Sequence, residues 1–216
     1  EHVSHLVDQF SAGWEPRLEL VVDGMMPSGV LLSVLKEMVN LNIPTHVQLR
    51  VEYLGGVQQR FEQGDAELML ALAYEPSNRY VVNALNPVET LLVVSADHAL
   101  AKVKNITLDT LQQHVELTVH DSSYRKAHGG WQTFGGERVF YLSDFRAKRE
   151  ALTMGLGYGW MPMAMIQDEL ASKQLVELDY QGGSRHQYTP VLINRRDQAL
   201  GRAGQWLVER LLERFG

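Results

Sequence analysis

The stretch between residues 18 and 72 alternates between strand-like and helix-like patterns, and this alternation limits the folds open to the chain more than any other feature. Periodicity predicts a strand, a helix, a half-buried strand, a short helix and a fully apolar strand, in the order Leu18–Val22, Val30–Leu41, Val47–Tyr53, Gly55–Gln63 and Leu68–Leu72. Strands and helices that alternate in this way form a parallel sheet with helices on its faces. The uninterrupted apolar character of the last strand is typical of a central strand that is covered on both sides.

A second α/β unit is expected further along the chain. The predicted strands are Arg79–Leu85, Thr90–Ser95, Val115–Val119, Arg138–Leu142, Leu175–Leu178 and Pro190–Asn194. The predicted helices are Leu108–Gln113, Phe145–Met154, Ala164–Ala171 and a last amphipathic helix through Ala203, Leu207 and Leu211. We expect one strand, Thr90–Ser95, to leave the first unit and another, Val191–Asn194, to return to it, so that two crossover strands form a hinge. The predicted fold class is therefore α/β with two lobes joined by two crossover strands, lobe I at 14–92 and 194–216 and lobe II at 93–193.

The composition is that of an ordinary globular protein. The 216 residues suit one large domain or two small lobes, and 45% of them are hydrophobic against 21% charged, which argues against disorder. A formal net charge of −6, without a long basic cluster, argues against a free-standing nucleic-acid binder. The chain has no cysteine, which excludes disulfides and thiolate metal sites. Its least charged run contains three glycines and a proline and is too short to span a membrane.

The first residues show a helical pattern of their own. Val3, Leu6, Val7 and Phe10 recur at helical spacing, and Gly13 ends the pattern. Two interpretations stay open at this point. The amphipathic helix is either part of a longer protein from which this chain is taken, or an ordinary N-terminal helix.

The loop GMMPSG, between the first strand and the first helix, is the first candidate binding edge. In open parallel sheets, ligands bind beyond the carboxyl ends of the strands. The free amides at a helix N-terminus attract anions, and Ser28 adds a hydroxyl. The alternative for Ser28 is that it only caps the helix, and the two interpretations are compatible.

Two further candidate edges lie in the second unit. One is Val119–Ser123, which follows a strand, and the other combines Ser143–Asp144 with a short bend or strand at Tyr158–Trp160. Gly155 lies just past a predicted helix and is expected to end it in the left-handed conformation. Glycines between the aromatic residues leave room for a ligand to approach the backbone closely. The alternative for the two aromatic side chains is packing in the core.

The sequence does not favour catalysis or metal binding. His120, Asp121 and Ser122 are adjacent in the chain and point alternately to opposite faces, whereas a catalytic triad needs its members to converge from different segments. The nucleophile-elbow motif and the paired-histidine metal motifs are missing. The glycines at 155–159 follow a helix instead of preceding one, which is the wrong order for dinucleotide binding. We therefore predict no catalytic residue, no metal and no cofactor.

The order of these elements resembles the effector-binding domain of LysR-type transcriptional regulators. The segments that carry the resemblance are LELVVDGMMPSGVLLSVLKEM, LRVEYLGGVQQRFEQGDAELMLAL, ETLLVVSADHALA and REALTMGLGYGWMP. The third looks like the family's strand and D/H-P-L turn, with Ala99 where Pro is usual. The fourth looks like the family's helix that ends in G-x-G-x-x-x-x-P, which Gly155, Gly157 and Pro162 satisfy. The resemblance covers residues 14–215.

The resemblance implies a fold similar to that of type II periplasmic binding proteins, with two Rossmann-like lobes and a small inducer bound in the cleft between them. It implies that residues 1–13 are the end of a linker helix, preceded in the full-length protein by a winged helix-turn-helix. The effector would control DNA binding and transcription through that missing domain by allostery. The resemblance further implies a cytoplasmic protein, away from membranes, that forms a homodimer, with the helix at 30–41 facing the far-lobe helix of a partner chain, and a tetramer at full length.

The ligand-binding residues follow from the motifs of the same family. Those carried over are Met25, Met26, Pro27, Ser28, Gly29, Leu54, Tyr74, His120, Asp121, Ser143, Tyr158 and Trp160. Many members have Ser or Thr where this chain has the two methionines, and methionine adapts to irregular apolar ligands. With three aromatic residues in the same set, we expect an aromatic or largely apolar effector.

Two other functions share this architecture. A periplasmic solute-binding protein of a transporter predicts a secretory signal upstream and tight binding as a monomer, whereas the sensor predicts a helix-turn-helix upstream and dimers. The amphipathic pattern of the first residues favours the sensor. An enzyme on the same scaffold would need acid and base groups that converge in the cleft, and no convincing pair is apparent.

Overall fold

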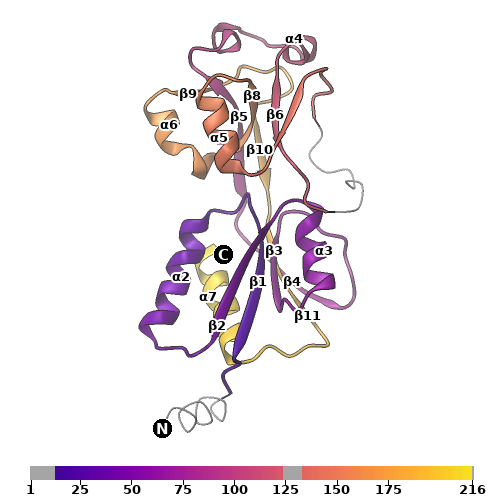
Figure 1. The fold of residues 1–216 in the computed structure, drawn as a ribbon, viewed down its shortest axis with the longest axis vertical. Coiled ribbons are helices and arrows are strands. Elements are labelled where there is room, and N and C mark those ends of the chain that lie inside the picture. The colour runs from indigo at the N-terminus through magenta and orange to yellow at the C-terminus, as the bar shows by residue number, and fades with distance from the viewer. Residues whose placement is uncertain (1–12, 124–132, 216) are drawn as a thin grey trace. The chain divides into compact units, whose positions relative to one another are not determined.

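The computed structural model describes residues 13–123 and 133–215, which form two α/β units (Figure 1). The described part of the first unit comprises 13–86, 122–123 and 189–215, and that of the second comprises 87–121 and 133–188. The predicted two-lobed α/β fold is confirmed. The unit boundaries lie at Asn86 and Tyr188 instead of the expected 92 and 193, because each crossover strand pairs along its whole length within one sheet. The predicted linker helix at 1–13 lies, apart from Gly13, outside the described residues.

The first unit contains a five-stranded sheet in the order β2-β1-β3-β11-β4. The strands are β1 (Arg17–Asp23), β2 (His46–Glu52), β3 (Leu68–Ala71), β4 (Tyr80–Ala84) and β11 (Val191–Arg195). β1 runs parallel to both β2 and β3, whereas β11 is antiparallel to β3 and β4. β3 is buried throughout, as its apolar run predicts for a strand inside the sheet. The carboxyl ends of β1, β2 and β3 therefore lie at one edge of this sheet.

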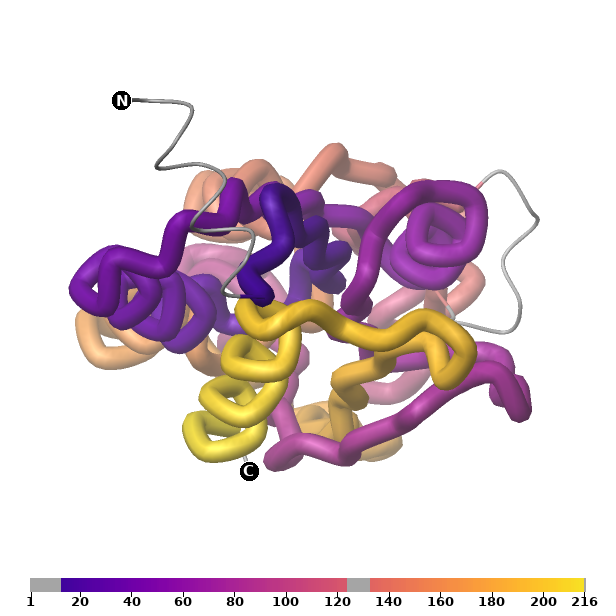
Figure 2. The backbone as a smooth tube through the Cα atoms, turned by 90° about the horizontal axis from the view of Figure 1, so that it is seen from below, coloured from indigo at the N-terminus to yellow at the C-terminus, as the bar shows by residue number. Residues whose placement is uncertain are grey.

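Three helices cover this sheet. They are α2 (Ser28–Asn40), α3 (Gly55–Gln63) and α7 (Arg202–Phe215). On one face, Val57 and Phe61 of α3 pack in a core with Val21 and Met69 of the sheet. On the other, α2 and α7 lie side by side (Figure 2), and the Glu37 carboxylate pairs with Arg214 at 2.5 Å.

The start of α7 is fastened to the first described residues. The two carboxylate oxygens of Glu15 accept hydrogen bonds from the backbone amides of Ala203 (2.9 Å) and Gly204 (2.6 Å). The guanidinium of Arg202 lies 4.4 Å from the centre of the Trp14 ring. Glu15 thus caps the helix and places a negative charge at the positive end of its dipole.

We expect Glu15→Ala to lower the free energy of unfolding by about 1–2 kcal/mol, because two helix amides lose their charged acceptor. Thermal denaturation followed by circular dichroism measures the effect as a drop of several degrees. Glu209→Ala is the matched control, since Glu209 is an exposed carboxylate in the middle of the same helix. Equal melting temperatures for the two variants would show that the cap contributes nothing.

The second unit contains a six-stranded sheet in which β10-β5-β8-β6-β7 are neighbours and β9 pairs with β5. The strands are β5 (Val88–Ser95), β6 (Glu116–Val119), β7 (Val139–Leu142), β8 (Tyr158–Pro162), β9 (Leu175–Glu177) and β10 (Arg185–Tyr188). β6 runs parallel to β7 and β8, and β5 is antiparallel to β8, β9 and β10. β10 was not expected because RHQY has no apolar alternation; backbone pairing with β5 and the ion pair from Arg185 to Glu177 hold it.

The helical segments of the second unit are short, except for α5. They are η1 (Ala99–Lys102), α4 (Leu108–Gln112), α5 (Phe145–Thr153), η2 (Met163–Met165) and α6 (Gln167–Ala171). The single helix expected at Ala164–Ala171 is wrong: Ile166 leaves the helical conformation, at φ −129° and ψ 20°, and is fully buried. The burial of this β-branched side chain coincides with the break between η2 and α6. None of the helices in the described parts of the chain has the length and apolar character needed to cross a bilayer.

Candidate functional site

A buried carboxylate organises the carboxyl edge of the first sheet. Asp23, the last residue of β1, is 2% exposed. Its Oδ1 accepts a hydrogen bond from the Met25 amide (2.9 Å) and its Oδ2 one from the Leu54 amide (3.2 Å). One side chain therefore fixes both the loop after β1 and the turn after β2. Asp23 was not among the predicted site residues, although a carboxylate at the end of an apolar strand is a recognisable signal.

The two loops approach each other closely and under strain. The Gly24 amide donates to the Glu52 carbonyl (2.9 Å), and a Cβ on Gly24 would lie 2.1 Å from the Tyr53 ring. Any larger residue at this position would force the Tyr53 ring to move. Leu54 has φ 54° and ψ −123°, a conformation that a branched side chain rarely adopts. Strain of this kind persists where the surroundings enforce it, and it is often found at binding sites.

The start of α2 differs from the expected one in two respects. Ser28 is the first residue of the helix and is exposed, but no side chain among the described residues caps the helix and the N-cap residue is Pro27, so the capping interpretation of Ser28 is wrong. Met25 and Met26 are 3% and 4% exposed and belong to the core, which contradicts the expectation of an adaptable methionine surface. Gly29 is exposed beside Ser28.

The turn after β2 also receives a distant part of the chain. The Tyr53 amide donates to the Ser122 Oγ (2.8 Å), and the Ser122 amide donates to the Tyr53 carbonyl (3.3 Å). A Cβ on Gly56 would lie 1.9 Å from the Ser122 Oγ, so the glycine leaves room for the serine. Tyr74, in contrast, packs against the core cluster under α3.

In the second unit, the ends of β6 and β7 bring three predicted residues to one edge. His120 and Asp121 follow β6, and Ser143 follows β7, its parallel neighbour. The His120 amide donates to the Leu142 carbonyl (3.0 Å), and its ring lies edge-on to Tyr141 at 6.3 Å. His120 and Ser143 are exposed.

The two aromatic residues of β8 have different surroundings. Tyr158 is fully buried in a core cluster, which is the alternative that the sequence left open for it, and its role in ligand binding stays a prediction. Trp160 is only partly buried, and its ring lies 4.5 Å from that of His186 and 6.5 Å from that of Phe134. Residues two apart in a strand face the same side, so both aromatic side chains lie on one face of the sheet, with Gly159 between them.

Two buried ionisable side chains of opposite charge type, those of Glu116 and Lys148, lie beside this aromatic cluster. Glu116 and Lys148 are each 4% exposed. Burial raises the pKa of Glu116, an effect opposed by the Phe134 amide and by Lys148. Burial lowers the pKa of Lys148 to about 7, an effect opposed by Glu116. Sequence patterns do not reveal this pair, because its members are 32 residues apart, on a strand and a helix.

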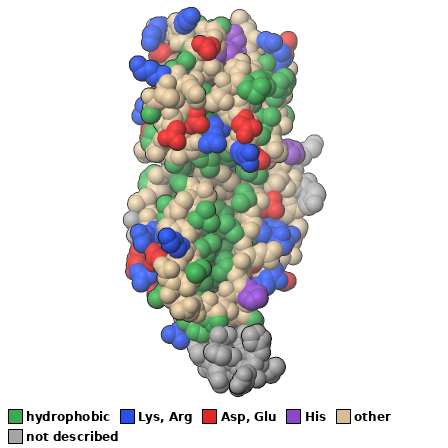
Figure 3. Space-filling view, turned by 60° about the vertical axis from the view of Figure 1, so that its left-hand side comes forward, with side chains coloured by type: hydrophobic (Ala, Val, Ile, Leu, Met, Phe, Trp, Pro, Cys, Tyr) green, Lys and Arg blue, Asp and Glu red, His purple; other side chains and the backbone are tan. Residues whose placement is uncertain are grey.

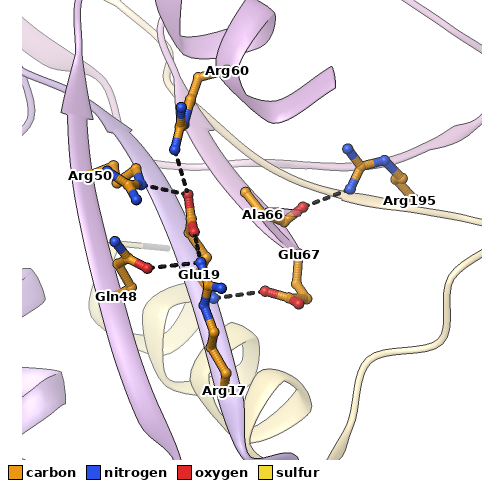
Figure 4. Close-up of polar contacts among 8 residues, drawn as sticks. All are labelled: Arg17, Glu19, Gln48, Arg50, Arg60, Ala66, Glu67 and Arg195. Atoms are coloured by element: carbon orange, nitrogen blue, oxygen red, sulfur yellow. Dashed lines mark hydrogen bonds and ion pairs between the residues drawn. The ribbon is translucent and has the colours of Figure 1, made fainter. Parts of the chain in front are cut away.

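The densest ionic cluster of the first unit surrounds Glu19, four residues before Asp23 on β1. Arg17, Arg50 and Arg60 all point at its carboxylate (Figure 4), with the Arg50 Nε at 2.8 Å and an Arg60 terminal nitrogen at 3.8 Å. The Glu19 amide donates to the Glu67 Oε2 (2.7 Å). The cluster joins β1, β2 and α3, and its cations are already engaged by the carboxylate. It lies away from the carboxyl ends of the strands and is structural. Within the described residues, no group of three or more His, Asp or Glu side chains could hold a metal ion.

Comparison with known proteins identifies the family. The model of the LysR substrate binding domain matches residues 11–216. The chain belongs to this family. It is 25% identical over 203 residues to an uncharacterized HTH-type transcriptional regulator of Escherichia coli K12, YeeY, covering 93% of this chain and 65% of that protein. It is 23% identical over 175 residues to the HTH-type transcriptional regulator CitR of Bacillus subtilis, covering 78% of this chain and 59% of that protein.

Solved structures share the fold of this LysR substrate-binding domain. The regulatory domain of CcmR from Synechocystis, solved in complex with 2-PG, has a TM-score of 0.71 at 18% identity and covers 93% of this chain and 98% of its own. ArgP from Mycobacterium tuberculosis has a TM-score of 0.74 at 13% identity, covering 99% of this chain and 72% of its own. The predicted resemblance is therefore confirmed, and the sensor is favoured over the solute-binding protein.

Proposed function

We propose that this LysR substrate-binding domain senses a small-molecule effector and controls transcription through a helix-turn-helix region of a longer chain. Its curated relatives are helix-turn-helix transcriptional regulators, and the chain spans about two thirds of the length of the YeeY regulator. Among the solved neighbours, LysG from Corynebacterium glutamicum is described with its bound effector Arg. A regulator that binds DNA would act in the cytoplasm. It would bind its effector without converting it chemically.

The observation that carries the proposal is the loop arrangement fixed by Asp23. The loops after β1 and β2 are held by one buried carboxylate, and Leu54 is held in a strained conformation between them. Such preorganisation lowers the cost of binding a ligand. We propose Pro27, Ser28, Gly29 and Leu54 as effector contacts in the first unit. In the second unit, we propose Asp121 with the exposed residues His120 and Ser143, together with the partly buried Trp160.

A thermal-shift screen of aromatic acids, phenols and quinones tests this proposal. We expect an effector that raises the melting temperature, because a ligand that binds only the folded state stabilises it. Ser28→Ala and His120→Ala should each reduce that shift, whereas Ser33→Ala, at another exposed serine of α2, should not. A hit that is unaffected by both substitutions would place the effector elsewhere.

We also propose that the domain dimerises through the outer surface of α2 and β2. Leu32 and Val39 of α2, Leu41 just after it and Val51 of β2 are all more than half exposed. Figure 3 shows hydrophobic side chains gathered in a band over this part of the first unit. An isolated apolar band of this kind marks an interaction surface, and a two-fold dimer would bury it in a self-complementary way.

Val39→Asp combined with Leu32→Asp should convert a dimer into a monomer, with at least a hundredfold weaker association, because charged side chains would be buried in the apolar interface. Analytical ultracentrifugation measures the change. Val103→Asp is the control, since Val103 is an exposed valine of the second unit. A dimer that survives the double substitution would refute this surface.

A further inference from the structure

The ring of Phe134 lies within a cage of three other aromatic rings in the second unit. Tyr158 lies 5.7 Å away, Tyr180 lies 5.4 Å away in an edge-on orientation, and Trp160 is stacked at 6.5 Å with 14° between the planes. Two walls of the cage come from β8 and the third from the segment between β9 and β10. These separations are typical of favourable aromatic pairs. The cage is therefore formed for a planar ring.

The occupant of the cage, Phe134, is not itself part of a strand. Phe134 lies in the connection between β6 and β7, outside any helix or strand. Its amide donates to the Glu116 Oε2 (2.8 Å), and its carbonyl accepts from the Gln112 Nε2 (2.6 Å). Gly135, with φ 76°, and Gly136 follow directly. The ring can thus leave its place without loss of any pairing between strands.

One wall of the cage carries an unused hydrogen-bonding group. The Tyr158 side chain is fully buried, and its hydroxyl has no hydrogen-bond partner among the described residues. Buried hydroxyls nearly always have a partner, and leaving one without costs stability. Phe134 fills the cage sterically but offers this hydroxyl nothing.

We propose that this aromatic cage is a binding site for a phenol or a similar neutral planar ring with a polar N–H or O–H substituent, and that Phe134 is an internal occupant which the ligand displaces. The ring would stack on Trp160, and its substituent would pair with the Tyr158 hydroxyl. Departure of the Phe134 amide leaves a Glu116 oxygen in need of a donor. The same carboxylate would repel an anionic ligand, so benzoate-like acids are disfavoured.

The cage deepens the proposed function. A role of the cage in regulation rests on that function, whereas ligand binding by the cage does not. Phe134 lies in the same β6–β7 connection as the proposed effector contacts His120 and Asp121. Part of the cage therefore belongs to the same connection as part of the proposed effector site. Binding of phenol to the cage is a separate property that is measured without DNA.

Calorimetric titration of this chain with phenol tests the site. We expect saturable binding, with an affinity that rises at least tenfold in Phe134→Ala, because the ligand no longer competes with an internal ring. Phe140→Ala is the matched control, since Phe140 is an exposed phenylalanine of β7 outside the cage. Adding Tyr158→Phe to the Phe134→Ala variant should remove most of the preference for phenol over benzene. Equal phenol affinity in the wild-type chain and in Phe134→Ala would overturn the proposal, as would a phenol preference that survives loss of the Tyr158 hydroxyl.

A measurement on the wild-type chain does not depend on the folding of any variant. Nuclear Overhauser contacts between the Phe134 and Trp160 rings should disappear as phenol saturates the site and should persist in benzoate. Contacts that persist at saturating phenol would overturn the displacement. If phenol binds the cage as expected but Ser28→Ala and His120→Ala do not reduce the thermal shift of any effector, the cage stands and the proposed function fails. If the two variants reduce the shift but phenol does not displace Phe134, only the cage proposal fails.

Discussion

Glu116→Ala is expected to lower the free energy of unfolding of the second unit by about 2–3 kcal/mol, because a buried carboxylate that accepts a backbone hydrogen bond is removed. The substitution leaves the Phe134 amide without its acceptor and removes the carboxylate that favours the charged form of the buried Lys148. Chemical denaturation followed by tryptophan fluorescence measures the loss, because Trp160 lies in this unit.

The double variant Glu116→Ala with Lys148→Met separates the charge effect from simple loss of packing. Replacing two buried groups of opposite charge by apolar side chains is often neutral, so we expect at least half of the lost stability to return. The hydrogen bond from the Phe134 amide is still missing in the double variant, which explains why recovery is not complete. A double variant that is as unstable as Glu116→Ala would show that the two charges are not coupled.

The same pair gives stability a predictable dependence on pH. The pKa of Lys148 falls from its ordinary 10.5 to about 7 in the folded unit, so between these values the unfolded chain binds a proton that the folded unit does not. The contribution of Lys148 to stability therefore rises with pH from about 7 upwards and is level below about 7. Unfolding by urea at about pH 7 and about pH 9 should detect this rise in the wild-type chain and a smaller one in Lys148→Met. An identical rise in both would contradict the assignment.

Asp23→Ala is expected to cost about 3 kcal/mol of stability and to abolish binding of any effector found in the screen. The buried backbone amide of Met25 and the partly buried amide of Leu54 lose a charged acceptor, and hydrogen bonds to charged groups contribute about 1.5–3 kcal/mol each. Effector binding is lost because the loops after β1 and β2 no longer share an anchor. Thermal melting and the ligand-induced shift are measured on the same samples, with Asp97→Ala, at an exposed aspartate of the second unit, as the control.

A second substitution tests whether Asp23 acts by holding Leu54 in its strained conformation. Glycine adopts a φ of 54° without the steric cost that leucine bears. Adding Leu54→Gly to Asp23→Ala should therefore restore about 1 kcal/mol of stability. If the added glycine lowers stability further, the carboxylate stabilises the fold in some way other than by holding this turn.

Most of the fold could be predicted from periodicity, because apolar side chains recur where a sheet or helix must bury one face. β3 and the helix α3 coincide closely with their apolar patterns. β10 could not be predicted in this way, because it is an edge strand whose side chains are polar and whose place depends on pairing with β5. The break at Ile166 likewise depends on where the side chain is buried, which local propensity does not encode.

The site was less predictable, because its determinants join residues that are distant in the chain. The loops after the strands could be located, since ligands in such sheets bind at carboxyl edges. Asp23 was missed because its partner amide at Leu54 is 31 residues away. Tyr158 has the same local pattern as Trp160, and only the packing of Phe134 and Tyr180 around it reveals that it is buried.

The fastening of Glu15 to α7 has a mechanical consequence. Residues 13–15 join the first unit at the beginning of its last helix, through the Arg202 amide, two further amides and a cation–ring contact. Any displacement of α7 would therefore be transmitted directly to residues 13–15. The first described residues and the last helix would then move as one rigid body.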